Sequence, residues 1–466
     1  MTIHAETAAR APGPPGQLGL RNVIRFTTDP LALLRDLTDR YGDVVEMNVL
    51  GTPWLMLNHP DDIENALVKH ARAMGRDAYI DILQRTLGLG LLTSDGELWK
   101  RQRKLMAQAF TPKRIAEYAS TMVEVADDGL SWSAGEVVDV HAEMSRITME
   151  VVARVLFGTG IGPEDVEQVH ESMETVAEFY ASSPEAVLKL PGWVPTPRNV
   201  RVNAAVRRID ELIYRIIADR RGGPPRHDLL GTLLAACDDG GRGMSDKQLR
   251  DEAITLFLAG HETTALALAH TLYLVSKHPE VERRLADEVA GVLGGRRPSM
   301  RDVQALAYTT RVIKEGMRLY PPAWTTGREA TEDVVIGGYR IPKGAQLLIA
   351  QWVVHRDPRW FPNPEAFDPD RWGQARAADL PRYAYFPFGG GPRVCIGNHF
   401  AMMEAVLILA MVVQRYRLEL LPGQRLELVP SVTLRAKAGM RMRVGDRAPR
   451  REARRRGSPR VAAAPA

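Results

Sequence analysis

Cysteine is scarce in this chain of 466 residues, which has only Cys237 and Cys395. Two cysteines so far apart argue against a disulfide framework and favour a reducing compartment. Neither charge sign dominates, because a formal net charge of +4 is small for this length, and this argues against a nucleic-acid-binding protein. The first residues contain no apolar run that could form a secretion signal or a membrane anchor. We therefore expect a cytoplasmic protein without a membrane anchor.

Much of the excess positive charge lies at the C-terminus, in residues 446–466, which are rich in Arg, Pro and Ala and lack apolar periodicity. This composition predicts a disordered cationic tail. A polyanion-binding role is the alternative to a merely solvated segment. Residues 1–17 are predicted to form a flexible, proline-rich leader. The chain shows no internal repeat and no convincing interior linker, so residues 18–445 are predicted to form one large domain.

Most of that domain has helical periodicity. Apolar residues recur at helical spacing in four segments, 95–110, 146–158, 202–221 and 251–279. Strand patterns occur near both ends: two strands in residues 41–57 around a turn at Gly51 to Pro53, and further strands in 333–354 and after Arg417. A helix is expected to begin at Pro60, and residues 220–228 to form a loop. The fold class is thus mainly α with a smaller β portion (α+β).

Cys395 stands in the unusual segment FPFGGGPRVCIGNHF, residues 386–400. The glycines at 389 to 391 permit dihedral angles and close backbone approaches that other residues forbid, and Pro392 fixes the exit of the loop. A helix is expected to begin near Ile396. Its dipole and nearby Arg393 would both stabilise a thiolate at Cys395. For a cysteine taken alone, the alternative is a small buried hydrophobic side chain.

The complete spacing decides between these interpretations. It places Phe388, Gly389, Gly391, Arg393, Cys395 and Gly397 in the pattern F-G-x-G-x-R-x-C-x-G, which Phe400, Ala401 and Glu404 continue. This segment resembles the signature of the cytochrome P-450 family. The resemblance implies that Cys395 is the axial thiolate ligand of haem b iron, that Phe388 packs beside it and that Arg393 pairs with a haem propionate. Gly389 and Gly397 would complete this cofactor-binding loop. A thiolate ligand donates electron density to iron and favours O–O cleavage.

A second motif lies within the long apolar helix predicted at 251–279. Residues Ala259 to Thr264 read A-G-H-E-T-T. Gly260 costs about 1 kcal/mol relative to Ala inside a helix, and a Thr263 hydroxyl bonded four residues back would bend the helix and open a groove. The alternative is a polar stripe on an exposed helix. The family resemblance implies that Glu262 and Thr263 deliver protons, that Ala259 borders the cofactor and that His261 is not a ligand. Haem would lie between this central helix and the helix after Cys395.

Further segments resemble the family's structural and cofactor-binding positions. Glu315 and Arg318 form E-x-x-R, which with Arg371 resembles a buried charged triad of structural role. Each would otherwise be a common surface charge. Trp99 and Arg103 fit W-x-x-x-R, and Arg328 stands where the family has a propionate-binding arginine. A guanidinium group can bind a carboxylate bidentately, whereas either arginine taken alone would be a solvated charge.

The resemblance, which covers roughly residues 12–445, implies a haem-thiolate monooxygenase. Such an enzyme inserts one oxygen atom of O2 into a hydrophobic small molecule. Apolar segments at the expected pocket favour a hydrophobic substrate bound largely by shape. The segment PEAFDPDRW, residues 364–372, resembles the branches of the family that hydroxylate fatty acids and terpenes, so a terpenoid or a fatty acid is favoured, with polyketide or macrolide tailoring as the alternative. A peroxide-using or isomerising enzyme and a non-catalytic haem sensor are the alternatives of other classes.

Electrons would come from a separate ferredoxin or flavodoxin with its reductase, because no reductase segment follows Cys395. Arg101, Arg103 and Lys104 are candidates for the surface on which that partner docks. Arg85 is a candidate carboxylate anchor, with a solvated arginine as the alternative. The enzyme is expected to be a monomer.

Overall fold

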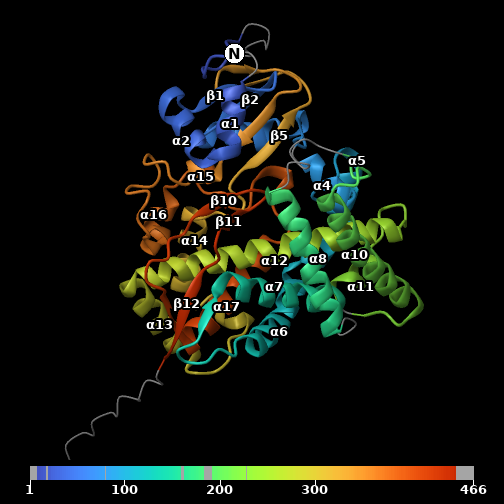
Figure 1. Cartoon of the computed structure of the whole chain (residues 1–466), viewed down its shortest axis with the longest axis vertical. Helices are drawn as coiled ribbons and strands as arrows, with labels where there is room; N and C mark the ends of the chain where they lie inside the picture. The colour runs from blue at the N-terminus through green and yellow to red at the C-terminus, as the bar shows by residue number, and fades with distance from the viewer. Residues whose placement is uncertain are drawn as a thin grey trace, which may run out of the picture.

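The computed structural model describes residues 8–16, 19–78, 80–158, 162–182, 191–226 and 228–447. The predicted leader falls outside these ranges in residues 1–7 and at residue 17, and the predicted tail does so from residue 448 onward. The described part is mainly helical with a smaller β portion, as the sequence predicts. Figure 1 shows the sheet and the N-terminal helices gathered at one end of the molecule and most of the other helices at the other.

The helices begin where the sequence provides caps. Thr111 and Thr196 each accept a hydrogen bond from a backbone N–H of the first turn and are followed by proline at the first helical position. The longer helices are α1 Leu20–Thr28, α2 Pro30–Tyr41, α4 Ile80–Leu87, α5 Gly96–Ala107, α6 Pro112–Gly129, α7 Val140–Phe157, α8 Pro163–Ser182, α10 Pro197–Gly222, α12 Asp246–Lys277, α13 Pro279–Leu293, α14 Ala307–Leu319 and α17 Asn398–Arg415.

Short helices connect these elements. They are α3 Pro60–Glu64, α11 Leu229–Ala235, α15 Gln351–Val354 and α16 Gln374–Ala378, the π-helix η1 Asn65–Lys69, and the 3-10 turns η2 Ala71–Ala73, η3 Gln108–Phe110, η5 Met300–Asp302, η6 Pro369–Trp372, η7 Arg382–Ala384 and η8 Gly391–Arg393. The predicted strand pattern at 333–354 is wrong at its end, because residues 351–354 form α15. The helix expected near Ile396 begins at Asn398, and the loop predicted at 220–228 is shorter, because α10 continues to Gly222.

The largest sheet combines strands from distant parts of the chain, in the order β1-β2-β8-β5-β3. β1 and β2 form an antiparallel pair in which Val44 faces Leu57, and β2 runs parallel to β8 with Trp54 facing Gln346. The sequence therefore predicts correctly that the β portion is assembled from both ends. The strands are β1 Val44–Val49, β2 Thr52–Leu57, β3 Met74–Gly75, β4 Val137–Asp139, β5 Thr326–Ala330, β6 Val334–Ile336, β7 Tyr339–Ile341, β8 Gln346–Ile349, β9 Tyr416–Leu420, β10 Leu428–Pro430, β11 Leu434–Ala436 and β12 Arg441–Asp446.

Both ends of the described chain pack against this framework. The Glu46 N–H donates to the carbonyl of Pro12 at 2.8 Å, the Arg340 N–H donates to that of Ala9 at 3.0 Å, and Ala11 is buried. Residues 8–16 of the predicted leader are therefore docked against strands. At the other end, β12 continues to Asp446, where the tail was predicted to begin. Among the described residues, no helix is long and apolar enough to span a membrane.

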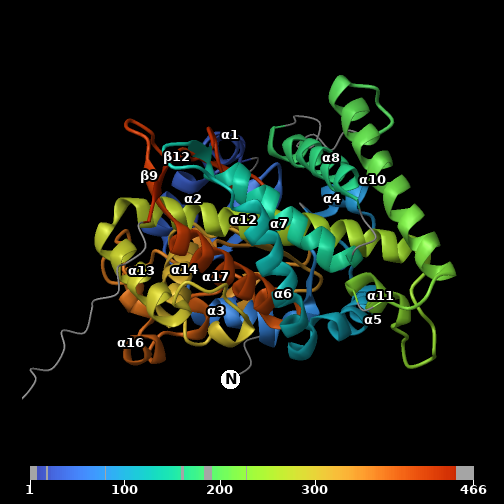
Figure 2. The ribbon, with the colours of Figure 1, turned by 90° about the horizontal axis from the view of Figure 1, so that it is seen from below.

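Helix α12 runs through the centre of the helical part. It has 32 residues, and Ser245 caps its first turn by accepting from the Gln248 N–H. Figure 2 shows α12 crossing the molecule with α7 lying across it. It also contacts α10, α14 and α17, so nearly its whole length is buried. An apolar helix of this kind is stable only in the centre of a large domain.

Candidate active site

The loop that carries Cys395 depends on its glycines. Gly391 has φ of 65°, and a Cβ there would lie 1.9 Å from the carbonyl oxygen of Leu67. A Cβ on Gly390 would lie 2.3 Å from the ring of Tyr383. The Cys395 N–H donates to the carbonyl of Phe388 at 3.0 Å and closes the loop. The sequence therefore predicts correctly that close backbone approach requires glycine here.

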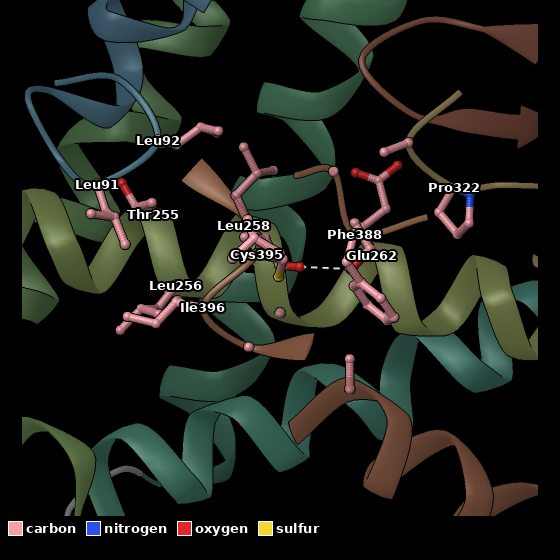
Figure 3. Close-up of a pocket in the computed structure, with 18 of the residues that line it drawn as sticks. Leu91, Leu92, Thr255, Leu256, Leu258, Glu262, Pro322, Phe388, Cys395 and Ile396 are labelled. Carbon is pink, nitrogen blue, oxygen red and sulfur yellow. Dashed lines mark hydrogen bonds between the residues drawn. The ribbon is translucent and has the colours of Figure 1, made fainter. Parts of the chain in front are cut away.

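The Cys395 thiol opens into an interior cavity of about 450 Å³. Burial raises the pKa of this thiol, while the backbone hydrogen bond from Gly397 and the charge of Arg103 act in the opposite direction. Figure 3 shows Cys395 and Phe388 beside α12, from which Leu258 and Glu262 project. The Cys395 side chain is solvent-exposed and lines the cavity, so it is accessible to a group bound there.

Helix α12 forms the opposite wall, where Ala259 and Thr263 line the cavity. The Thr263 hydroxyl donates to the carbonyl of Ala259 at 2.8 Å, the bond four residues back that the sequence predicts. The helix nevertheless continues without a break through Gly260. A Cβ on Gly260 would lie 2.8 Å from Val152 Cγ2, so this glycine permits close packing of α12 on α7.

Glu262 is buried and bound by the β10–β11 hairpin. Its Oε1 accepts from the Thr433 hydroxyl at 2.8 Å and also forms an ion pair with Arg435. Burial alone would raise the pKa of Glu262, but the charge and hydrogen bond of Arg435 outweigh it and lower the pKa. The carboxylate is therefore held ionised. Its neighbour His261 is outside the cavity lining, and its Nδ1 lies 2.7 Å from the Phe257 carbonyl oxygen.

The three predicted cofactor-binding arginines line the same cavity, but their partners differ. Arg393 forms an ion pair with Asp95 and stacks over Trp99, with 4.3 Å between the guanidinium carbon and the ring centre. Arg103 makes no hydrogen bond or ion pair with any residue that the structure describes. Arg328 donates to the Gly327 carbonyl at 2.6 Å and has no carboxylate partner within the described ranges. Burial lowers the pKa of Arg328 to about 10.

The guanidinium groups of Arg103 and Arg328, which lack ion-pair partners among the described residues, indicate what kind of cofactor the cavity can hold. Both guanidinium groups are half-buried, and a partly buried cation without an ion-pair partner is costly unless a bound group supplies the negative charge. Arg103, Arg328 and the Cys395 thiol border one cavity, and Phe388, Gly389 and Gly397 border it beside them. These residues fit a planar iron cofactor with carboxylate substituents: the thiol for the metal and the arginines for the carboxylates.

Glu315, Arg318 and Arg371 lie together, as the sequence pattern indicates. Arg318 is fully buried and binds both carboxylate oxygens of Glu315, at 2.9 and 2.8 Å. Arg371 donates from Nε to Glu315 at 3.1 Å, and the Trp372 indole donates at 3.0 Å. Arg318 also donates to three backbone carbonyls, those of His355, Pro364 and Ala366. The cluster joins α14 to the segment that leads into η6.

Three other predicted cations already have partners elsewhere in the chain. Arg101 pairs with Asp238, and Lys104 pairs with Asp239 at 2.6 Å. Arg85 donates to Asn199 Oδ1 at 2.8 Å and to Asn203 Oδ1 at 2.9 Å, and it is absent from the cavity lining. The structure thus ties Arg85 to α10, where it links two helices beside the cavity.

Two sets of contacts at the site could not be predicted from the sequence. Nothing in the sequence connects Glu262 with Arg435, because they are 173 residues apart and belong to elements of different type. The side chains of α12 that hold the loop before α5, Asp251 and Glu252, also have no recognisable signature. Only the position of D-E at the start of a long apolar helix could have drawn attention to them.

Comparison with known proteins assigns the family. The family model for cytochrome P450 matches residues 12–439, and the chain therefore belongs to the cytochrome P450 family. Cyclooctatin synthase of Streptomyces melanosporofaciens is 39% identical, over 91% of this chain and 93% of that protein. Pentalenene oxygenase of Streptomyces avermitilis is 31% identical, over 96% and 100%. The solved structure of retinoic acid bound cyanobacterial CYP120A1 superposes with a TM-score of 0.83 at 26% identity, covering 94% of this chain and 100% of that one.

This membership fixes the class of reaction. The protein is a haem-thiolate monooxygenase that uses O2, a small-molecule substrate and electrons from redox partners. Haem supplies the activation of dioxygen and the transfer of one oxygen atom. What the chain itself supplies is the thiol, the paired and unpaired arginines, the hydroxyl of Thr263 and the apolar cavity.

Proposed function

We propose that this chain is a terpenoid monooxygenase in which Cys395 ligates the haem iron and Arg103 and Arg328 bind the propionates. The observation that carries the proposal is the cavity itself, where a thiol and two guanidinium groups without ion-pair partners in the described part of the chain line one largely apolar space. The names of two relatives, cyclooctat-9-en-7-ol 5-monooxygenase and pentalenene oxygenase, support oxygenation of cyclic terpenoids.

The apolar walls of the cavity support a hydrocarbon-like substrate. Leu83, Leu91, Val155 and Leu258 contribute side chains to the lining. Such walls select a substrate by shape, and few polar groups orient it. Arg85 donates from its two terminal nitrogens to Asn199 and Asn203 and does not line the cavity, so it does not serve as the carboxylate anchor that a fatty acid would use. A neutral polycyclic terpenoid is therefore favoured over a fatty acid.

Thr263 and Glu262 are the proposed proton-delivery residues. Thr263 lines the cavity, so its hydroxyl can donate a proton to a group bound there and then take up another proton. Glu262 is ionised and bound to Arg435, whose side chain is 23% exposed, so this ion pair connects the cavity wall with solvent. In this proposal Glu262 accepts and releases protons through the hairpin side of α12.

The electrons are proposed to come from a separate ferredoxin or flavodoxin with its reductase. Since Arg101 and Lys104 are paired with Asp238 and Asp239, they contribute less free charge to docking than the sequence suggests. We assign docking instead to the face over the Cys395 loop, where Arg382 and Lys314 border a second cavity.

The first test is the absorption spectrum of the reduced protein with carbon monoxide, followed by titration with cyclic sesquiterpenes, cyclic diterpenes and fatty acids. We expect the long-wavelength band of a thiolate complex, its loss in Cys395→Ser, and a substrate-induced spectral shift with one terpene class. A wild-type band at the position of a histidine complex would overturn the ligand assignment. A thiolate band with shifts from fatty acids alone would overturn the terpenoid assignment and leave the ligand assignment intact.

A further inference from the structure

The start of α12 holds the loop between α4 and α5. Three consecutive side chains, Arg250, Asp251 and Glu252, are 6%, 3% and 0% exposed. Asp251 Oδ2 accepts from the Leu89 N–H at 2.9 Å, and Glu252 Oε2 accepts from the Leu91 N–H at 2.9 Å. Arg250 donates to the carbonyl of Thr86 at 3.1 Å. One helical turn therefore binds the end of α4 and the loop that follows.

The loop, residues 88–94, fits closely against this turn. Gly88 has φ of 66°, and a Cβ there would lie 2.2 Å from Asp251 Oδ1. A Cβ on Gly90 would lie 2.2 Å from Thr255 Oγ1 and 2.5 Å from the Asp251 carbonyl oxygen. Both glycines are therefore required for the approach. Loops that connect helices are usually mobile, whereas this one is bonded and packed to the central helix.

The same loop contributes part of the cavity wall. Leu91 and Leu92 line the cavity, and Figure 3 shows them at its edge near Thr255 on α12. Because Glu252 binds the N–H of Leu91 itself, it fixes the backbone from which this wall residue projects. An apolar substrate with few polar contacts is oriented mainly by such walls, and a small displacement of one wall changes which substrate atom is nearest the reaction centre.

We propose that Asp251 and Glu252 are positioning residues that determine substrate selectivity by holding Leu91 and Leu92 at the cavity wall. Neither carboxylate lines the cavity, so they act through the loop backbone. The proposal rests on the proposed function in one respect, that the substrate is apolar and oriented by shape. It adds a determinant of selectivity that lies outside the cavity.

The experiment compares Glu252→Ala with Glu252→Gln in the haem-loaded protein. Alanine removes the acceptor for the Leu91 N–H, whereas glutamine keeps one. In the alanine variant we expect amide hydrogen exchange in residues 88–94 to be about tenfold faster, the size expected for one lost hydrogen bond. We also expect weaker binding of the terpene found for the wild type and a broader mixture of oxygenated products. The glutamine variant should resemble the wild type in all three measurements.

Two further variants separate positioning from general destabilisation. Glu288 accepts from the N–H groups of Tyr308 and Thr309 at 2.6 and 2.7 Å, away from the cavity lining. Glu288→Ala therefore removes the same kind of contact and should leave loop exchange and product ratios unchanged. Gly90→Ala displaces the loop from α12 without altering Glu252, and it should reproduce the broader product mixture even if Glu252→Ala fails to fold.

The outcomes distinguish this proposal from the proposed function. Faster amide exchange in residues 88–94 with unchanged terpene affinity and product ratio would overturn the selectivity role. Unchanged amide exchange in both Glu252→Ala and Gly90→Ala would overturn the anchoring of the loop by α12. If no terpene binds the wild type, the proposed function fails. In that case the affinity for a phenylimidazole, which binds in a haem cavity independently of turnover, is measured instead. Unaltered phenylimidazole affinity in both Glu252→Ala and Gly90→Ala would overturn the proposal.

Discussion

At the scale of single residues, the Thr263 hydroxyl links the cavity to the backbone of α12. It donates to the carbonyl of Ala259 at 2.8 Å and still has acceptor capacity on the cavity side. We expect Thr263→Ala to keep consuming O2 while product per O2 falls at least about tenfold and hydrogen peroxide is released instead, because acid–base groups contribute at this scale or above. Parallel measurement of O2 uptake, peroxide and product checks this.

The matched control for Thr263 is Thr271→Ala. Thr271 is on the same helix, donates to the carbonyl of Ala267 at 2.6 Å and lies outside the cavity lining. Its loss removes the same local bond but no group from the cavity, so coupling should stay at the wild-type level. Equal uncoupling in both variants would mean that the helix, and not the Thr263 hydroxyl, is responsible.

Residues with chemical roles differ in how far the sequence could predict their surroundings. The position of Cys395 in its loop could be predicted, because glycines nearby in sequence define that loop. The surroundings of Glu262 and Arg393 could not. Their partners Arg435 and Asp95 come from distant segments, and only the fold brings them within ion-pair distance. The sequence shows the charges of Arg101 and Arg85, but it does not show which groups bind them.

At the scale of elements, the contact of α12 with α7 depends on Gly260. A Cβ at this position would lie 2.8 Å from Val152 Cγ2, closer than packed atoms allow. We expect Gly260→Ala to lower the melting temperature of the wild type but to raise it in a Val152→Ala background. In that background the added methyl group has space, and the better helix propensity of alanine remains. The coupling between the two sites should be about 1–3 kcal/mol.

Gly291→Ala serves as the control for this cycle. Gly291 lies within α13, and a Cβ there would meet no other atom within 4 Å. It should therefore stabilise either background equally through helix propensity alone. If the effects of Gly260→Ala and Val152→Ala on stability were additive, α12 and α7 would not be in tight contact at this point.

The cluster at Glu315 concerns the connection between α14 and η6. Glu315→Gln keeps the shape of the side chain but leaves the fully buried Arg318 and its neighbour Arg371 without a counter-charge. Breaking a buried ion pair in this way costs about 3–5 kcal/mol. Thermal unfolding of the haem-loaded protein should show a correspondingly lower melting temperature, and haem should be lost earlier in the transition.

Glu97→Gln is the matched change on the surface. Glu97 pairs with Lys100 on α5, and their side chains are 88% and 64% exposed. Such pairs contribute little to stability, so the melting temperature should not change. A similar loss in both variants would remove the argument for a structural role of Glu315.

At the scale of the whole molecule, the sheet connects the two ends of the chain around the helical core. β2 pairs in parallel with β8, almost 300 residues later, so this pairing requires the intervening chain to bring two distant segments together. The sequence predicts that strands exist at both ends, since their local pattern is clear. It cannot predict their order or the docking of residues 8–16, because these depend on contacts between segments without a shared local signal.

The stability of the assembled molecule should depend on pH through His270. This side chain is fully buried on α12, and neither ring nitrogen has a hydrogen-bond partner in the described part of the chain. Burial lowers its pKa to about 3. The folded protein therefore keeps His270 neutral, while the unfolded chain takes up a proton below its ordinary pKa of about 6.5. Stability is fully present above this value and is lost as the pH falls toward about 3.

His270→Phe removes this proton uptake and keeps an aromatic ring against Tyr320, whose ring centre lies 5.2 Å from that of His270. Between neutral pH and pH of about 5, the wild type should lose about 2 kcal/mol more stability than the variant, in addition to losses common to both. Melting temperatures across this range provide the measurement, with His399→Gln on the exposed first turn of α17 as the control. Parallel curves for wild type and His270→Phe would show that this buried histidine does not limit acid stability.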